Sequence, residues 1–189
     1  VPAGAAGVGV SLQGEAGSVT WEFKSDVSGD ADVDGDLLGV GVGFVFDTNC
    51  ARDELVNYRI NANLMYNDMD FEHVSESDAT VGIFADNYVG FGVIRNPKLR
   101  LWVGPHVRLG YFKGVGDGLT DGMVGAEFGV GPAAGLNLHL NREMDLGLTA
   151  GLRYSFVNGT WEDSAGNDED FSGNSSSFFF NVALLFRGI

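Results

Sequence analysis

Residues 38–46 read Leu-Gly-Val-Gly-Val-Gly-Phe-Val-Phe, so large apolar side chains alternate with glycine until the last two positions. Successive side chains of a β-strand point to opposite faces, so this stretch predicts a strand with one apolar face and one face nearly free of side chains. The 189-residue chain has 29 glycines, well above the usual share of about 7%. So many glycines suggest that the same alternation recurs elsewhere in the chain.

Seven further segments alternate in the same way between polar links. Eight strands of this kind predict an all-β protein, an eight-stranded antiparallel up-and-down barrel forming one domain over residues 1–189. The predicted apolar faces span Val8–Leu12, Leu38–Phe46, Val56–Tyr66, Ile83–Val93, Leu99–Tyr111, Val124–Leu138, Met144–Phe156 and Phe178–Phe186.

Alternation alone also fits a soluble lipocalin-type barrel, which turns its apolar face inward. Here the apolar face carries no charge and Asn87 is its only strongly polar member. Such a face suits lipid, where Arg or Lys at the midplane costs about 2–4 kcal/mol. The opposite face mixes glycines with arginines, as a narrow lumen requires, and aromatic residues gather near both ends of the strands. The apolar runs are too short for a transmembrane helix of about 20 residues. These features favour a transmembrane β-barrel.

The predicted links alternate between long and short. Long outer loops and short periplasmic turns are typical of outer-membrane barrels, so both termini are expected in the periplasm and the long loops outside the cell. The links span Gly14–Asp36, Asp47–Glu54, Asp68–Asp78, Arg95–Lys98, Lys113–Gly122, His139–Glu143 and Asn158–Ser175. Pro105 and Pro132 fall inside strands, where each removes a hydrogen-bond donor, and predict local bulges.

The chain resembles the small eight-stranded outer-membrane barrels of the OmpA transmembrane-domain, OmpX and OmpW kind. Phe178–Phe186 looks like the C-terminal strand of that family, which implies an assembly signal. The resemblance implies the bacterial outer membrane, with outer-membrane lipid and lipopolysaccharide as partners, and we expect a monomer. The net charge of −15 argues against nucleic-acid binding.

Charged residues on the inward face predict a lumen network. Buried charges must be paired, so Glu127 is expected to bridge two arginines from the neighbouring segments 99–111 and 144–156. An eight-stranded barrel has room for little beyond its own side chains, which favours a structural plug over a gated ion or solute path. The predicted network comprises Arg59, Arg100, Arg108, Glu127 and Arg153.

Most of the 26 acidic residues fall in the predicted long loops. One explanation is a solvated acidic surface, and the other is divalent-cation binding. In the first long loop, carboxylates at alternate positions with Gly35 sixth resemble the opening of an EF-hand calcium loop, although the twelfth position is Gly41 and the usual Glu is absent. The candidate Ca²⁺ ligands are Asp30, Asp32, Asp34 and Asp36.

Three functions remain open. A structural or surface-binding role through the acidic loops, with an extracellular ligand, is the first, because exposed loops on a rigid scaffold commonly bind. An OmpW-like channel for small apolar solutes is the second, supported by inward Phe84, Tyr88 and Trp102. The third is a lipid A-modifying enzyme, for which His73 with Ser75, Ser77 and Asp78 is the only suggestive group. We expect no enzyme and no obligatory cofactor.

Overall fold

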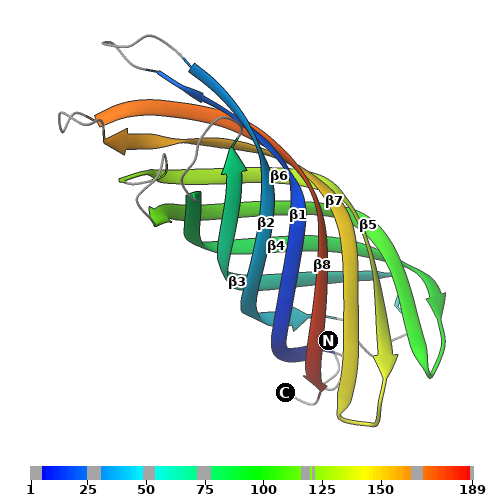
Figure 1. The fold of residues 1–189 in the computed structure, drawn as a ribbon. Coiled ribbons are helices and arrows are strands. Elements are labelled where there is room, and N and C mark those ends of the chain that lie inside the picture. Colours follow the sequence, from blue (N-terminus) through cyan, green and yellow to red (C-terminus); the bar gives the residue numbers. More distant parts are fainter. Residues whose placement is uncertain are drawn as a thin grey trace.

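The computed structural model describes residues 6–24, 31–48, 54–71, 78–115, 120, 122–162 and 168–187. Eight antiparallel strands close into one barrel in chain order, with β1 paired to β8 (Figure 1). The predicted eight-stranded barrel is confirmed. The strands are β1 (Gly7–Phe23), β2 (Ala31–Asp47), β3 (Val56–Phe71), β4 (Asp78–Arg95), β5 (Leu99–Val115), β6 (Val124–His139), β7 (Met144–Glu162) and β8 (Asp168–Arg187). No helix of the described residues is long and apolar enough to span a membrane.

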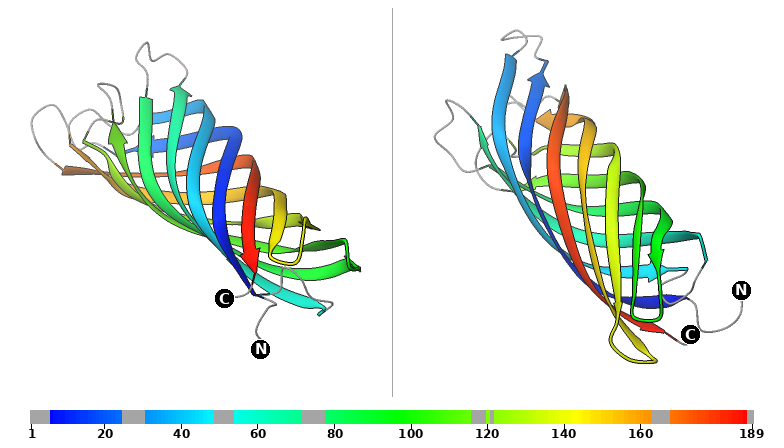
Figure 2. Two further views of the ribbon diagram at one scale, coloured as in Figure 1. Left: turned by 90° about the horizontal axis from the view of Figure 1, so that it is seen from below. Right: turned by 90° about the vertical axis from the view of Figure 1, so that its right-hand side faces the viewer.

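The barrel has two distinct ends. At the terminal end, β1, β3, β5 and β7 begin and β2, β4, β6 and β8 finish (Figures 1 and 2). At the distal end, β1, β3, β5 and β7 finish and the other four strands begin. Two of the four predicted long loops are wrong, because strands occupy most of Gly14–Asp36 and of Asn158–Ser175.

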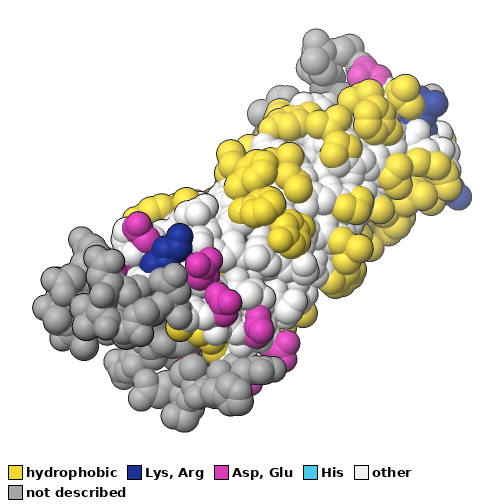
Figure 3. All heavy atoms as spheres, turned by 90° about the horizontal axis from the view of Figure 1, so that it is seen from above, with side chains coloured by type: hydrophobic (Ala, Val, Ile, Leu, Met, Phe, Trp, Pro, Cys, Tyr) yellow, Lys and Arg dark blue, Asp and Glu magenta, His cyan; other side chains and the backbone are white. Residues whose placement is uncertain are grey.

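The middle of the barrel carries an apolar outer surface, here called the band. Its predicted alternation is confirmed: large apolar side chains of every strand point outward, and the Phe44 side chain is 74% exposed. Figure 3 shows these side chains gathered over one length of the barrel, with acidic side chains beyond them toward one end. Asn87 is polar within the band, and its side-chain oxygen accepts a hydrogen bond from the Tyr58 hydroxyl. The amide of Asn87 also donates to the Ala85 carbonyl at 3.2 Å.

At the distal end the inward positions become apolar and the outward positions polar, while the alternation of inward and outward residues continues unbroken along each strand. Along β1, Ser11 and Gln13 face inward, and the same alternation then buries Val19, Trp21 and Phe23. The buried apolar side chains of this region, here called the apolar cap, are Val19, Trp21, Phe23, Leu37, Met65, Met69, Phe71, Phe84, Phe112, Met123, Val157 and Phe171.

The bulges predicted at the two prolines are absent. Pro105 and Pro132 lie opposite each other on β5 and β6. The register is unchanged across Pro105, since Tyr88 pairs with His106 and Phe91 with Val103. The shift in that strand pair lies instead between Gly92 and Ile94. Pro105 interrupts the pairing of β5 with β4, and Pro132 interrupts the pairing of β6 with β7. Neither adds a residue to its strand, because a proline lacks only the amide donor.

Glycines on the inward face make room for aromatic rings. A Cβ at Gly110 would lie 2.1 Å from the Phe84 ring, and a Cβ at Gly135 would lie 2.2 Å from the Trp102 ring. The glycine face seen in the sequence therefore makes room for a few large aromatic side chains of the lumen.

Candidate functional site

The lumen holds two groups of charges separated by aromatic rings. The first lies near the terminal end around Arg59. Its Nε donates to Asp47 Oδ2 at 2.9 Å, Nη1 donates to Thr149 Oγ1 at 2.8 Å and Nη2 donates to Asn137 Oδ1 at 2.6 Å. Arg100, also inward and buried, donates to the Asn57 side chain and the Leu55 carbonyl, both at 3.3 Å. Each nitrogen of the Arg59 guanidinium therefore has a partner, as burial of a charge demands.

The second group, here called the charge network, consists of Glu15, Asp86, Arg108, Glu127 and Arg153. Arg108 donates two hydrogen bonds to Asp86, from Nε to Oδ1 at 2.7 Å and from Nη2 to Oδ2 at 3.0 Å. Its remaining nitrogen, Nη1, donates to Glu15 Oε2 at 2.9 Å. This paired geometry is strong and directional, because both partners are planar.

Glu15 is the bridge between two arginines, and the expectation for Glu127 is wrong. Glu15 Oε2 also accepts from Arg153 Nη2 at 3.0 Å, so one carboxylate joins β1 to β5 and β7 across the lumen. Glu127 accepts from the Ser155 hydroxyl at 2.6 Å and forms an ion pair with Arg153 alone, at 3.3 Å. The sequence pattern predicts that β1 ends at Gln13 and that Glu15 lies in a loop, whereas β1 continues to Phe23 and turns Glu15 inward.

Aromatic rings fill the space between the two charged groups. His106 Nε2 lies 2.8 Å from Asp86 Oδ1, and its ring stacks on Tyr88 with centroids 4.7 Å apart. Phe179 packs on the other rings from β8. Arg59 lies over the Trp102 ring at 5.5 Å. The inward positions predicted for Phe84, Tyr88 and Trp102 are confirmed.

The apolar cap lies in the lumen on the distal side of the charge network. Trp21 contacts the rings of Phe71 and Phe171 at centroid distances of 5.3 and 5.4 Å. Phe23 packs edge-on against Trp161 at 5.6 Å. Below, Arg108 lies 4.9 Å from the centroid of the Phe84 ring, so the cap and the charge network are in contact. Charged and apolar layers thus succeed one another along the barrel axis.

A third polar group lies at the terminal end. His139 Nδ1 is 2.6 Å from Asp145 Oδ1, and Arg187 Nε is 3.2 Å from Asp145 Oδ2. Arg187 also donates to the Asn141 carbonyl. This group fastens the last strand to the link between β6 and β7, a structural role.

The candidate calcium ligands do not form a loop. Asp32, Asp34 and Asp36 lie on the exposed outer face of β2, and Asp30 lies outside the described residues. Alternate strand positions place their side chains side by side along the wall, and among the described residues no three acidic, His or Cys side chains are grouped to hold a metal ion. The EF-hand geometry expected from the spacing is therefore wrong, because that geometry requires a turn at Gly35 and the structure has a strand there.

These aspartates belong to a larger acidic surface, here called the acidic wall, on β1, β2 and β3. Glu22 lies directly opposite Asp32, and Asp36 lies directly opposite Asp70. Like charges in these positions repel. Asp34 differs, because its carboxylate accepts from the Thr20 hydroxyl at 2.7 Å. The acidic wall comprises Glu22, Asp32, Asp34, Asp36, Asp68 and Asp70.

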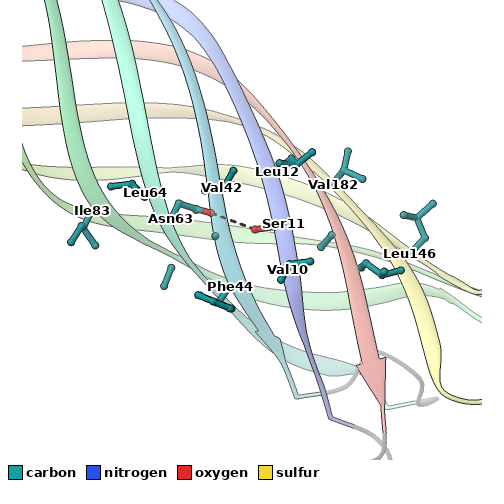
Figure 4. Close-up of a pocket in the computed structure, with 14 residues that line it drawn as sticks. Val10, Ser11, Leu12, Val42, Phe44, Asn63, Leu64, Ile83, Leu146 and Val182 are labelled. Carbon is teal, nitrogen blue, oxygen red and sulfur yellow. Dashed lines mark hydrogen bonds between the residues drawn. The ribbon is translucent and has the colours of Figure 1, made fainter.

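A hollow of about 880 Å³ lies on the outside of the band, not in the lumen. It is lined by Gly43 and by aliphatic side chains such as Val10, Val42 and Leu64 (Figure 4). The hydrogen bond from Ser11 to Asn63, 3.4 Å long, lies on the other side of the sheet, in the lumen. A hollow so lined, on a lipid-facing surface, suits acyl chains and offers nothing to a polar solute.

Comparison with solved structures extends the fold assignment. OprG, an outer membrane protein from Pseudomonas aeruginosa, superposes with a TM-score of 0.68 at 11% identity, covering 98% of this chain and 97% of OprG. Neisserial surface protein A gives a TM-score of 0.37 at 15% identity, covering 92% of this chain and 96% of its own. The outer membrane protease OmpT from Escherichia coli gives 0.45 at 10% identity, covering 98% and 97%. The last two scores are too low to carry an argument.

No known protein family matches the sequence, and no curated protein matches it. The likeness to OprG, at 11% identity, establishes a shared fold and no activity. The chain accordingly has the fold of an eight-stranded outer-membrane β-barrel, as its resemblance to small barrels of this kind predicts.

Proposed function

We propose that this outer-membrane barrel is a monomeric structural and surface-binding protein without a permanent pore. The observation that carries the proposal is the filled lumen. A solute moving along the axis would meet the Arg59 group, the rings of Tyr88 and Trp102, the charge network and then the apolar cap. An eight-stranded barrel holds its own side chains and little else.

Conductance across a planar bilayer tests the absence of a pore. Purified, refolded barrel is expected to give no discrete openings. A control with Arg108→Ala and Glu15→Ala together removes the centre of the charge network, and openings in that variant would show that the assay detects a barrel that conducts. Steady openings by the unaltered protein would contradict the proposal.

The distal end is proposed to face the outside of the cell and the terminal end the periplasm. Exposed Arg95, Lys98 and Arg142 lie in or beside the terminal links, whereas the acidic wall lies toward the distal end. Protease access in intact cells checks this orientation: a cleavage site inserted in the link 163–167 should be cut, and one in the link 140–143 should be cut only after the cells are opened.

The surface role is proposed to reside in the acidic wall. It lies just beyond the band, where the phosphates of lipopolysaccharide would be neighbours, and divalent cations such as Ca²⁺ can bridge two negative surfaces. A polar groove of about 400 Å³ on the same side, lined in part by Thr20, Asn158 and Asn174, offers hydrogen-bonding groups to an extracellular ligand.

Calorimetric titration with Ca²⁺, on barrels in lipopolysaccharide-containing membranes, tests the cation bridge. Changing Asp32 and Asp34 to Asn should reduce the heat of binding. Equal heats for the altered and unaltered proteins would contradict cation binding at this wall, and leave the absence of a pore unaffected.

Passage of small apolar solutes is a second candidate, favoured by the apolar cap. Its aromatic side chains make the distal lumen apolar, whereas glycine, asparagine and arginine make the lumen of the mid-barrel polar. Proteoliposomes loaded with a solvatochromic dye would report entry of a small aromatic hydrocarbon faster than protein-free liposomes do. Equal rates would exclude this role.

We propose no enzymatic activity. Of the histidines, His106 contacts Asp86 and His139 contacts Asp145, so each has a carboxylate as its hydrogen-bond partner. His73, Ser75 and Ser77 lie outside the described residues, and Asp78 is buried with its Oδ1 accepting from the Thr120 amide. Mass spectrometry of lipid A with and without expression checks this: an unchanged profile is expected, and a new mass would overturn it.

A further inference from the structure

A small cavity lies in the distal lumen where the charge network meets the apolar cap. It measures about 30 Å³. Glu15, Glu127 and Arg153 line it from the charge network, and Trp21 and Met69 from the cap. Asn67 also lines it. This cavity therefore has one charged side and one apolar side.

Three buried polar atoms of its lining residues have no hydrogen-bond partner among the residues that the structure describes. They are Trp21 Nε1, Asn67 Oδ1 and Arg153 Nη1, and these residues are only 3%, 6% and 3% exposed. Buried polar groups in folded proteins almost always find a partner, which is either protein, water or a ligand. Trp21, Asn67 and Arg153 all line this one cavity, so a polar group bound there would have two donors and one acceptor within its lining residues.

The chemistry of these atoms defines the occupant. Trp21 Nε1 and Arg153 Nη1 are donors and need an acceptor, whereas Asn67 Oδ1 is an acceptor and needs a donor. A primary amide or an alcohol supplies both. A carboxylate is disfavoured, because Glu15, Asp86 and Glu127 outnumber Arg108 and Arg153 around the floor. A cation is disfavoured by the two unpaired donors.

We propose that this cavity binds the polar head of a small neutral amphiphile, with the amide or hydroxyl group on the charged side and a short alkyl tail among the apolar side chains of the cap. The volume of about 30 Å³ is enough for two or three waters, since a water needs about 10–15 Å³. A head group therefore fits, and the tail displaces flexible side chains such as Met69, whose unbranched thioether adapts readily. The site goes beyond the proposed surface role and requires no pore.

Indole signals in nuclear magnetic resonance spectra test the site, because the chain has three tryptophans. ¹⁵N-tryptophan-labelled barrel in lipid nanodiscs would be titrated with butyramide, and its signals assigned with Trp102→Phe and Trp161→Phe. The Trp21 Nε1–H signal should move saturably while that of Trp102, outside the cavity, stays. Butyrate and butylammonium, with tails of the same length, should give no saturable shift.

Two asparagines provide matched variants. Asn67→Leu removes the acceptor in the cavity and should weaken butyramide binding about tenfold, the effect of one good hydrogen bond. Asn61→Leu is the control, because Asn61 is also buried without a partner but does not line the cavity. Val157→Phe fills the cavity without touching a polar partner and should abolish the response, so the test survives if Asn67→Leu fails to fold.

The absence of a saturable Trp21 shift with butyramide would overturn the proposal and leave the cavity to water alone. Equal binding of butyrate, or equal weakening by the changes at residues 61 and 67, would overturn it as well. Since none of these readouts depends on conductance or on Ca²⁺, failure here is distinguishable from failure of the proposed surface function.

Discussion

In the band, the strands turn large apolar side chains outward around a charged interior, whereas at the distal end β1, β2 and β3 turn acidic side chains outward around an aromatic interior. β2 shows both patterns: Leu38, Val42 and Phe44 are exposed in the band, and Asp34 and Asp36 are exposed beyond it. The strand does not change register between them. The surroundings differ instead, because a wall must match lipid in one region and water in the other.

The two interiors differ accordingly in what holds them together. The band lies around hydrogen-bonded ion pairs, which are stable only while every partner is present. The distal end contains an apolar core of the kind found in soluble proteins, where removal from water is the main stabilising effect. Substitutions should therefore have different consequences in the two regions.

The largest effect is expected at Glu15, which bridges Arg108 and Arg153. Glu15→Leu leaves two buried guanidinium groups short of a partner and should lower the free energy of unfolding by about 3–5 kcal/mol. Urea unfolding from lipid vesicles measures it. Glu127→Leu is the control, with a smaller loss expected because Glu127 pairs with Arg153 alone. A larger loss of unfolding free energy for Glu127→Leu than for Glu15→Leu would mean that Glu127, and not Glu15, bridges the two arginines.

A charge on the outer wall should separate the two regions on a single strand. Val42→Arg places a cation in the middle of the band and should cost about 2–4 kcal/mol. Asp34→Arg, eight positions earlier on the same outer face, should change stability by less than about 0.5 kcal/mol. The same vesicle unfolding assay compares them. Equal costs would mean that the two outer surfaces meet the same solvent.

Packing around the lumen glycines gives the next effect. Gly135→Ala puts a methyl group 2.2 Å from the Trp102 ring, and such overpacking should cost about 1–3 kcal/mol. Gly14→Ala is the matched control, because the nearest atom to its new methyl group would be 4.0 Å away. If both variants unfold at the same urea concentration, the lumen is looser than these contacts imply.

The smallest effect concerns the acidic wall. Asp36→Asn relieves repulsion from Asp70 directly opposite and should stabilise the barrel by about 0.2–1 kcal/mol at low salt. The gain should fade as salt increases, because exposed charges are screened. Asp34→Asn should give no gain, since it weakens the bond from Thr20. A gain at Asp36 that persists in high salt would point away from charge repulsion.

Much of this architecture could be predicted from alternation. The phase of each band segment, the closed eight-stranded order and the inward positions of Arg59, Arg108 and Arg153 all follow from a period of two. The strand ends do not follow in the same way, because the pattern marks only where the large apolar residues of the outer face stop. Taking that point as the strand end holds for a wall surrounded by lipid alone, and it fails where a strand continues into water.

Two residues show what the sequence did contain. Glu15 follows Ser11 and Gln13 at the next inward position, and Asp47 follows Gly43 and Val45 in the same way. Continuing the period would have placed both carboxylates in the lumen. Which arginine each one meets could not be predicted, because partners across the lumen, such as Glu15 and Arg153, depend on the closure and stagger of the whole barrel.

The inversion along β2 is the central claim, and spin-label accessibility tests it most directly. Nitroxides would be attached to single cysteines replacing residues 34, 36, 38, 40, 42 and 44 in turn, with Cys50→Ser as background. Collisions with apolar oxygen should dominate at 40–44, those with a water-soluble nickel complex at 34 and 36, and the crossover should fall near 38. Nickel-dominated collisions at all six positions would contradict the account, since the band would then face water.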